Sequence, residues 1–316
     1  MSTIAVLKGG RSLERQVSLK SAAQVEDAIE RLGHEVLAID VGGDLVARLT
    51  EQRPDAVFIA LHGRDGEDGT VQELLEALGI AYTGSGVAAC IRCWDKVLTK
   101  HLLRDAGIPT PDFHAFGETA FRELGAAQAL PAIEQRLGFP LVIKPAAQGS
   151  ALGIKFAATA ADVPAALVSA FSYDRKVLLE RYVPGRDLAV SIVEEAGEPR
   201  ALPIVEAVPN EKDFYDFEAR YEIGRTRFVC PAELPQDVAA RTQALAVEVY
   251  RALGCVGFAR VDLMLHEDGG LLVLEANVVP GLTETSLLPQ AAETAGISFD
   301  ALVERLLSLA LARGAR

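Results

Sequence analysis

Strand-like apolar runs alternate with helical periodicity in the first third of the chain, and no other sequence feature constrains the fold so strongly. The strand-like runs lie at residues 3–7, 35–40, 56–63 and 80–84. Apolar residues with the spacing of one helix face occur between them, at residues 25–32 and 72–79. This alternation favours an α/β domain in which helices cover a parallel sheet. Such sheets bind ligands at the carboxyl ends of their strands. The loops at 8–14, 62–69 and 83–86 follow strands in this way and are therefore candidate ligand-binding loops.

The pattern changes after residue 94. The middle of the chain has a predicted helix at 95–109, strands at 139–145 and 177–183, and a loop at 146–153. The last third has predicted strands at 188–195, 201–208, 258–266 and 271–278, and helices at 239–254 and 301–312. These shifts predict three domains, at residues 1–94, 95–185 and 186–316. A long polar segment near 209–230, dotted with aromatic residues, has the length of a binding loop or lid.

Composition excludes several classes of protein. A chain of 316 residues that is 50% hydrophobic can build two or three domains with buried cores. A net charge of −13 makes it a poor partner for nucleic acid or an anionic membrane surface. No signal peptide is recognised, and no apolar run reaches the roughly 18 residues of a membrane-spanning helix. The chain has four cysteines, including the pair Cys90 and Cys93, which are too few for a disulfide framework. We expect them to pack as small apolar side chains in a cytoplasmic protein, in preference to forming a metal site.

The strongest chemical pattern lies on two predicted strands of the last third. Side chains two residues apart share one face of a strand, so Arg260 shares a face with Asp262, and Glu275 with Asn277. If these strands are neighbours, the two carboxylates and the amide meet, and such oxygen ligands suit Mg²⁺. The alternative is a set of ordinary polar residues on a solvated face, which the strongly apolar neighbouring residues disfavour.

A second pattern is the loop that follows Lys144. Gly149, Ser150 and Gly153 allow backbone N–H groups to approach a phosphate, and Lys144 supplies positive charge. With Lys96 and a downstream magnesium site, the loop predicts a nucleotide held between two sheets. The chain has no GxxxxGK[ST] sequence, so this is not a Walker motif. A simple hairpin turn is the alternative.

Two further patterns carry little weight. Residues 83–89 read TGSGVAA, a degenerate dinucleotide fingerprint, but no acidic residue at a strand end follows about 20 residues later. His62 and Ser286 invite a hydrolase interpretation, but neither candidate serine lies in a GxSxG elbow. NAD binding and acyl transfer by a catalytic triad are therefore disfavoured.

Motifs spread along nearly the whole chain resemble those of the D-alanine–D-alanine ligase family, in the ATP-grasp superfamily. They are GGRSLERQVSLKSA (9–22), ALHGRDGEDGTVQ (60–72), YTGSG (82–86), DK (95–96), VIKPAAQGSALG (142–153), FYDFEARY (214–221) and LEANVVPGLTETSLLP (274–289). The resemblance implies an α/β domain followed by a two-domain ATP-grasp module of α+β type, and a homodimer. It also implies ATP-dependent ligation of two D-alanines through an acyl phosphate, for peptidoglycan precursors. The alternatives are a ligase with a different amino- or hydroxy-acid acceptor and a non-catalytic homologue.

The resemblance further implies which residues meet the nucleotide. The phosphates would contact Lys96, Lys144 and Arg220, the last of which replaces a lysine that is common in the family. Adenine would contact Glu180, Tyr182 and Val183, and the ribose would contact Asp187. Mg²⁺, or Mn²⁺ in its place, would be held by Asp262, Glu275 and Asn277.

At the substrate end, the resemblance implies that Glu14 holds the ammonium group of the first D-alanine, with Ser150 and Tyr221 as its partners in closing the lid. Arg260 and the backbone of Gly281 would stabilise the tetrahedral intermediate. The remaining residues expected in the substrate site are His62, Ser286 and Leu287. The chain departs from the common family pattern at Ala151, which removes a hydroxyl near the phosphates, and at Val278, Val279 and Glu284, which bear on acceptor specificity.

Overall fold

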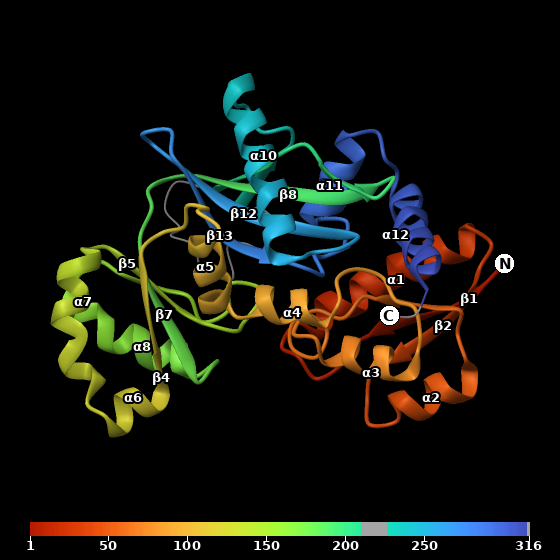
Figure 1. Ribbon diagram of the computed structural model, residues 1–316, viewed down its shortest axis with the longest axis horizontal. Coiled ribbons are helices and arrows are strands. Elements are labelled where there is room, and N and C mark those ends of the chain that lie inside the picture. The colour runs from red at the N-terminus through yellow and green to blue at the C-terminus, as the bar shows by residue number, and fades with distance from the viewer. Residues whose placement is uncertain (210–225, 315–316) are drawn as a thin grey trace.

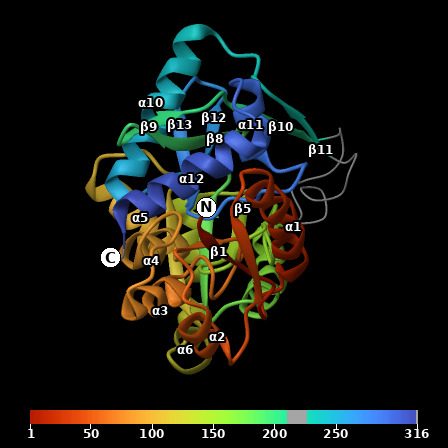
Figure 2. The same ribbon diagram turned by 90° about the vertical axis from the view of Figure 1, so that its right-hand side faces the viewer.

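The computed structural model describes residues 1–209 and 226–314, and these residues are arranged around three β-sheets (Figure 1 and Figure 2). One sheet is parallel and two are antiparallel, which confirms the predicted α/β and α+β fold class. Each sheet comes from one stretch of chain, close to the segments 1–94, 95–185 and 186–316 that we propose as domains. No helix in the described ranges combines the length and apolar character that a bilayer crossing requires.

The first sheet is the parallel one that the alternating pattern predicts. Its order is β2 (Glu35–Asp40), β1 (Thr3–Lys8) and β3 (Ala56–Ile59), with helices α1 (Arg15–Arg31), α2 (Leu45–Gln52) and α3 (Thr70–Leu78) between and beside the strands. The strand predicted at 80–84 is wrong, because only Tyr82 makes a β-bridge, to Val57. The chain turns away at Gly84, whose φ of 87° favours glycine, and then enters α4 (Val87–Trp94).

The second sheet is antiparallel and has its own core. Its order is β4 (Phe113–Gly117), β7 (Lys176–Arg181), β5 (Leu141–Pro145) and β6 (Lys155–Ala157). The helices of this part are α5 (Lys96–Asp105), α6 (Glu118–Glu123), α7 (Leu130–Leu137) and α8 (Val163–Phe171). Ile143, Leu167 and Leu179 belong to a buried cluster confined to this part of the chain. The sequence patterns revealed α5, β5 and β7, but missed β4, β6 and the three short helices.

The third sheet carries the two strands with the strongest chemical pattern. Its order is β11 (Thr226–Val229), β10 (Val205–Pro209), β8 (Gly185–Glu195), β12 (Phe258–His266) and β13 (Leu271–Asn277), and β9 (Glu198–Ala201) also pairs with β8. Its helices are α10 (Gln236–Leu253), α11 (Leu287–Thr294) and α12 (Phe299–Arg313). The single strand predicted at 201–208 is wrong: it is divided into β9 and β10 around Pro203, which has no N–H for the strand ladder.

The first and third sheets share a continuous core. Phe258 of β12 packs in one buried cluster with Ile4, Phe58 and Leu306, and α12 lies beside α1 (Figure 1). A Cβ atom on Gly84 would lie 3.1 Å from the Phe258 ring. Close packing between the two sheets therefore accounts for the glycine turn at 83–86 without a dinucleotide.

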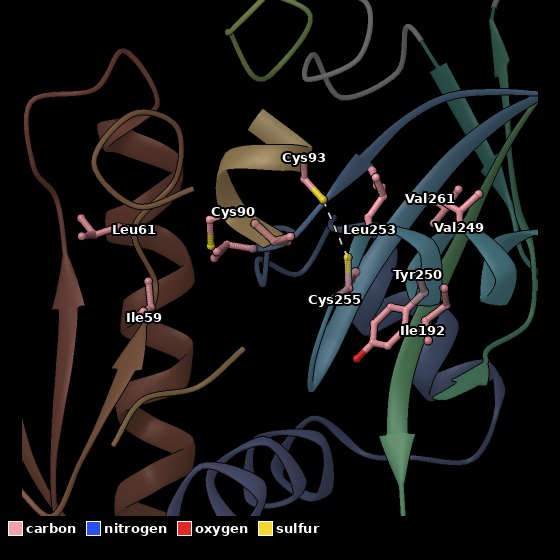
Figure 3. Close-up of a cluster of buried hydrophobic side chains, with 14 of the residues drawn as sticks. Ile59, Leu61, Cys90, Cys93, Ile192, Val249, Tyr250, Leu253, Cys255 and Val261 are labelled. Atoms are coloured by element: carbon pink, nitrogen blue, oxygen red, sulfur yellow. Dashed lines mark hydrogen bonds between the residues drawn. The ribbon is translucent and has the colours of Figure 1, made fainter. Parts of the chain in front are cut away.

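The cysteines of the described residues are free thiols in apolar surroundings, as the composition predicts. Figure 3 shows that Cys93 faces Cys255. The two Sγ atoms are 3.7 Å apart, and the Cys90 thiol donates a hydrogen bond to the carbonyl of Ser85. The hydrogen bond with Cys255 and burial raise the pKa of the Cys93 thiol. The CxxC pair is therefore built into the core, with its two thiols directed to different partners.

Candidate active site

A cavity of about 740 Å³ opens where α1, the β12–β13 pair and the loop after β5 meet. The residues predicted for the site that line it are Glu14, His62, Lys96, Ser150, Asp187, Arg260, Glu275, Asn277, Gly281, Ser286 and Leu287. Those outside its lining are Lys144, Glu180, Tyr182, Val183 and Asp262. Arg220 and Tyr221 lie outside the described residues, as does most of the segment expected as a lid.

The register of β12 and β13 brings the predicted polar residues together. Asp262 lies opposite Glu275, and Arg260 lies opposite Asn277. Arg260 and Asp262 share a face, with Nε to Oδ1 at 2.7 Å and Nη2 to Oδ2 at 2.8 Å. This two-bond pair covers Asp262, which is only 2% exposed, and leaves Arg260 on the cavity wall.

The oxygen atoms at this position fit a magnesium ion. Glu275 Oε2 lies 3.0 Å from Lys96 Nζ, and Asn277 Oδ1 accepts a hydrogen bond from the Val279 N–H at 2.8 Å. Mg²⁺ uses one or two carboxylates together with phosphate and water oxygens, so two carboxylates and an amide suit it when a nucleotide supplies the rest. Within the described part of the chain, no three His, Cys, Asp or Glu residues could hold a metal ion by themselves.

Lys96 connects the strand pair to the loop after β5. It is the first residue of α5, whose N-terminus is capped by Asp95 Oδ1 through the N–H groups of Val97 and Leu98. Its Nζ donates a hydrogen bond of 2.7 Å to the carbonyl oxygen of Gln148. The ammonium group therefore lies between the loop predicted to bind phosphate and the carboxylate of Glu275.

Lys144 and Glu180 form a buried ion pair beside the cavity. Lys144 Nζ donates to Glu180 Oε1 at 2.6 Å, and the other oxygen of Glu180 pairs with Lys100 Nζ. Burial opposes ionisation of Glu180, but the two ammonium groups outweigh it and lower the pKa of the carboxyl. Sequence reasoning missed Lys100. The available signal was its spacing, because it lies between Val97 and Leu103 on the buried face of α5.

Glu14 lies on the cavity wall, immediately before α1. Ser150 Oγ donates a hydrogen bond to Glu14 Oε1, which is the pairing that the family resemblance implies. A Cβ atom on Gly149 would lie 2.5 Å from Glu14 Oε2, so a larger residue there would displace the Glu14 carboxylate. Burial and the charge of Glu67 raise the pKa of Glu14 to about 7.

His62 supports the segment around residue 280. Its Nδ1 donates to the carbonyl of Val279 at 3.0 Å, and its Nε2 forms a hydrogen bond with Ser21 Oγ at 2.9 Å. Glu67 Oε1 lies 3.7 Å from Nδ1 and accepts a hydrogen bond from the Gly63 N–H. Sequence reasoning missed Glu67, although an acid within HGRDGEDG, five residues after the histidine, was the signal.

Ser286 is fixed by its neighbours just before α11. Its Oγ accepts a hydrogen bond from the Thr283 N–H at 3.0 Å and lies 2.8 Å from Thr283 Oγ1. A Cβ atom on Gly281 would lie 2.7 Å from Ser286 Oγ, so glycine keeps this side of the hydroxyl open. Leu287 follows as the first residue of α11 and also lines the cavity.

The family is identified by comparison with known proteins. A family model described as "D-ala D-ala ligase C-terminus" matches residues 102–308, and one described as "D-ala D-ala ligase N-terminus" matches residues 45–85. The chain belongs to the D-alanine–D-alanine ligase family. A relative named D-alanine–D-alanine ligase, from Moorella thermoacetica, is 43% identical over 308 residues, which are 98% of this chain and 99% of the relative. Another of that name, from Syntrophotalea carbinolica, is 45% identical and covers 96% of this chain and 95% of its own.

Solved structures of this family share the fold. The Bacillus anthracis D-alanine–D-alanine ligase complexed with ATP superposes with a TM-score of 0.83 at 32% identity, covering 99% of this chain and 98% of that one. The VanG D-Ala:D-Ser ligase of Enterococcus faecalis superposes with a TM-score of 0.82 at 27% identity, covering 97% and 98%. The three-sheet arrangement described here is therefore the ATP-grasp arrangement of these ligases.

Proposed function

We propose that this protein joins two molecules of D-alanine into D-alanyl-D-alanine at the expense of ATP, for peptidoglycan precursors. The observation that carries the proposal is the content of one cavity: Glu14, suited to an ammonium group, faces the same space as Lys96 and Glu275, suited to phosphate and magnesium. The names of the relatives favour D-alanine as the acceptor over a different amino or hydroxy acid.

The reaction needs activation because a carboxylate is a poor electrophile. Transfer of the terminal phosphoryl group of ATP to a carboxylate oxygen of the first D-alanine gives an acyl phosphate and ADP. The amine of the second D-alanine then attacks the carbonyl carbon, loses a proton, and displaces inorganic phosphate. The acyl phosphate is sensitive to water, so a closed cavity favours ligation over hydrolysis.

At the nucleotide end, we assign Lys96, Lys144 and Arg220 to the phosphates. The ribose and adenine are assigned to Asp187, Glu180, Tyr182 and Val183. Bound by Asp262, Glu275 and Asn277, Mg²⁺ would neutralise negative charge on the transferring phosphoryl group. The position of Lys96 between the Gln148 carbonyl and Glu275 supports these assignments, because both are walls of the space that the phosphates would occupy.

At the substrate end, Glu14 holds the ammonium group of the first D-alanine, and Ser150 and Tyr221 assist it. Arg260 and the Gly281 N–H stabilise the oxyanion that develops during attack by the second amine, since preorganised donors act at that stage. Ser286 and Leu287 receive the second D-alanine, and His62 holds the adjoining backbone through Val279.

Thr283→Val tests whether the orientation of Ser286 matters for the second D-alanine. The substitution removes the Thr283 Oγ1 contact with Ser286 Oγ and leaves the backbone hydrogen bond in place. We expect KM for the second D-alanine to rise about fivefold, the effect of losing one hydrogen bond of about 1 kcal/mol. Thr294→Val, on the exposed side of α11, is the control and should change KM less than about twofold. An unchanged KM in Thr283→Val would show that the Thr283 hydroxyl does not orient Ser286 for the second D-alanine.

The proposed reaction is tested directly by measuring phosphate release and dipeptide formation with ATP, Mg²⁺ and single amino acids. D-Alanine should give both products in equal amounts, and L-alanine should give neither. D-Serine supplied together with D-alanine tests whether the enzyme accepts a different second substrate. Glu284 lines the cavity and is the residue that we expect to affect this specificity. ATP-independent dipeptide formation, or no phosphate release with any D-amino acid, would overturn the proposal.

We also propose that the protein acts as a homodimer in the cytoplasm, which membership of the family favours. Sedimentation velocity at micromolar concentration tests the dimer, which should have about twice the mass of the 33.7 kDa chain.

A further inference from the structure

Lys100 is a fully buried lysine that has no role in the reaction proposed above. Its side chain has 0% exposure, and its Nζ pairs with a carboxylate oxygen of Glu180 and donates to Thr110 Oγ1 at 2.6 Å. The ring of Phe113 lies 5.6 Å from the same nitrogen. Burying an ammonium group is costly even when it is paired, so its presence calls for an explanation.

The charges around Lys100 do not balance within the buried cluster. Two ammonium groups, on Lys100 and Lys144, share the single carboxylate of Glu180. Apolar residues of similar size would stabilise the fold as well or better, because they avoid the desolvation of three charges. The excess positive charge would be balanced by an anion bound next to the cluster. Lys144 is the member of the cluster that we assign to the phosphates of ATP.

The contacts of Lys100 also connect the two sheets that enclose the proposed nucleotide. Thr110, which accepts from Lys100, donates its own hydroxyl to the carbonyl of Val273 at 2.8 Å. The Val273 N–H donates to the Pro109 carbonyl at 2.9 Å. Val273 is part of β13, two residues before Glu275, whereas Glu180 is part of β7. Lys100 therefore lies between the strand proposed to contact adenine and the strand proposed to hold magnesium.

We propose that Lys100 is a positioning residue for ATP: it occupies one oxygen of Glu180, which keeps the Lys144 ammonium available to the phosphates, and it ties β7 to β13. Without Lys100, Glu180 and Lys144 form a neutral pair in a medium of low dielectric constant, and the carboxylate competes with the phosphates for Lys144. The inference rests on the proposed function, because it presumes that ATP binds here.

Lys100→Met tests the proposal by removing the charge while keeping the length of the side chain. The dissociation constant for ATP is measured through the fluorescence of Trp94, which is the sole tryptophan of the chain and lines the cavity. We expect ATP to bind about tenfold more weakly or worse, because one member of a buried charge cluster is lost. KM for D-alanine, at saturating ATP, should stay within about twofold of the wild-type value.

Arg104→Met is the matched control. Arg104 is on the same helix as Lys100 and lies over the same ring of Phe113, at 4.3 Å, but it is exposed and pairs with Asp112. Its loss removes the same charge without touching Glu180, so the dissociation constant for ATP should change less than about twofold.

The pH dependence of ATP binding separates positioning from a merely structural role. The charged groups that face Lys100 are Glu180 on β7, Lys144 on β5 and Arg104 on α5. Burial lowers the pKa of Lys100 to about 8, so its ammonium form, which favours ATP, is lost as the pH rises above that value. Wild-type affinity should therefore fall above pH 8, and Lys100→Met should lack this fall.

Lys100→Met that folds and binds ATP with wild-type affinity and pH dependence would overturn the proposal. Should that variant fail to fold, Lys100→Gln removes the charge and keeps a polar side chain for Glu180 and Thr110. Loss of the fall above pH 8 in Lys100→Gln supports the proposal, and its retention overturns it. Absence of ATP binding by the wild-type protein would instead overturn the proposed function, and this inference with it.

Discussion

Asp262→Asn combined with Glu275→Gln is expected to lower the rate of phosphate release about a thousandfold or more, because charge stabilisation in the transition state is lost at two positions. Both substitutions preserve side-chain shape, and the amide introduced by Asp262→Asn retains an oxygen that can accept a hydrogen bond from Arg260. The loss should therefore fall on phosphoryl transfer and not on folding. Phosphate release at saturating ATP and D-alanine gives the rate, and thermal denaturation shows that the variant is folded.

A matched variant changes the same number of charges on the same strand pair. Glu267→Gln with Asp268→Asn alters two exposed acids at the turn between β12 and β13. We expect its phosphate release to stay within about twofold of wild type, as is usual for surface substitutions. Wild-type turnover by the variant at Asp262 and Glu275, at any Mg²⁺ concentration, would show that magnesium is not held there.

The parts of the site that sequence reasoning located are those set by local geometry. The pairing of Asp262 with Glu275 follows from two apolar strands joined by a short turn, because side chains alternate in direction along each strand. Helix α1 beside the first sheet was also predicted, since its buried residues Val25, Ala28 and Ile29 repeat at the spacing of α-helical turns.

The two site residues that were missed, Lys100 and Glu67, were missed for different reasons. Its spacing places Lys100 on the buried face of α5. Its ion pair forms because β5 and β7 bring Lys144 and Glu180 against that helix, and no local pattern encodes that approach. Glu67 acquires its position from the fold of the loop around Gly63, which supplies an N–H to its carboxylate. The short strands β4 and β6 were also not predicted, because strands of 5 and 3 residues offer too few positions for an alternation of apolar and polar residues to be recognised.

Glu14→Gln is expected to abolish ligation, with a fall in kcat/KM for D-alanine of about a hundredfold or more, and to stabilise the fold at the same time. The carboxylate is the group proposed to hold the ammonium of the first D-alanine, and truncating one partner of a buried charge pair is costly to binding. The amide introduced by Glu14→Gln keeps an oxygen for the hydroxyl of Ser150. Glu26→Gln, on α1 and paired with Lys8 away from the cavity, is the control and should retain wild-type kcat/KM.

The stability effect follows from the raised pKa of Glu14, which burial and Glu67 bring to about 7 from an ordinary value of 4.5. Between these two values the folded state binds more protons than the unfolded state, so this carboxyl makes the protein less stable as the pH rises through that window. Glu14→Gln removes the effect, so at pH 8 it should raise the free energy of unfolding by on the order of 3 kcal/mol. Below pH 4.5 the difference should disappear, because Glu14 is then protonated in both states. Thermal denaturation at pH 4 and pH 8 measures the stability difference between the variant and the wild type at each pH. A variant less stable than the wild type at pH 8 would contradict the proposal that the Glu14 carboxylate destabilises the fold and is present for its role in binding.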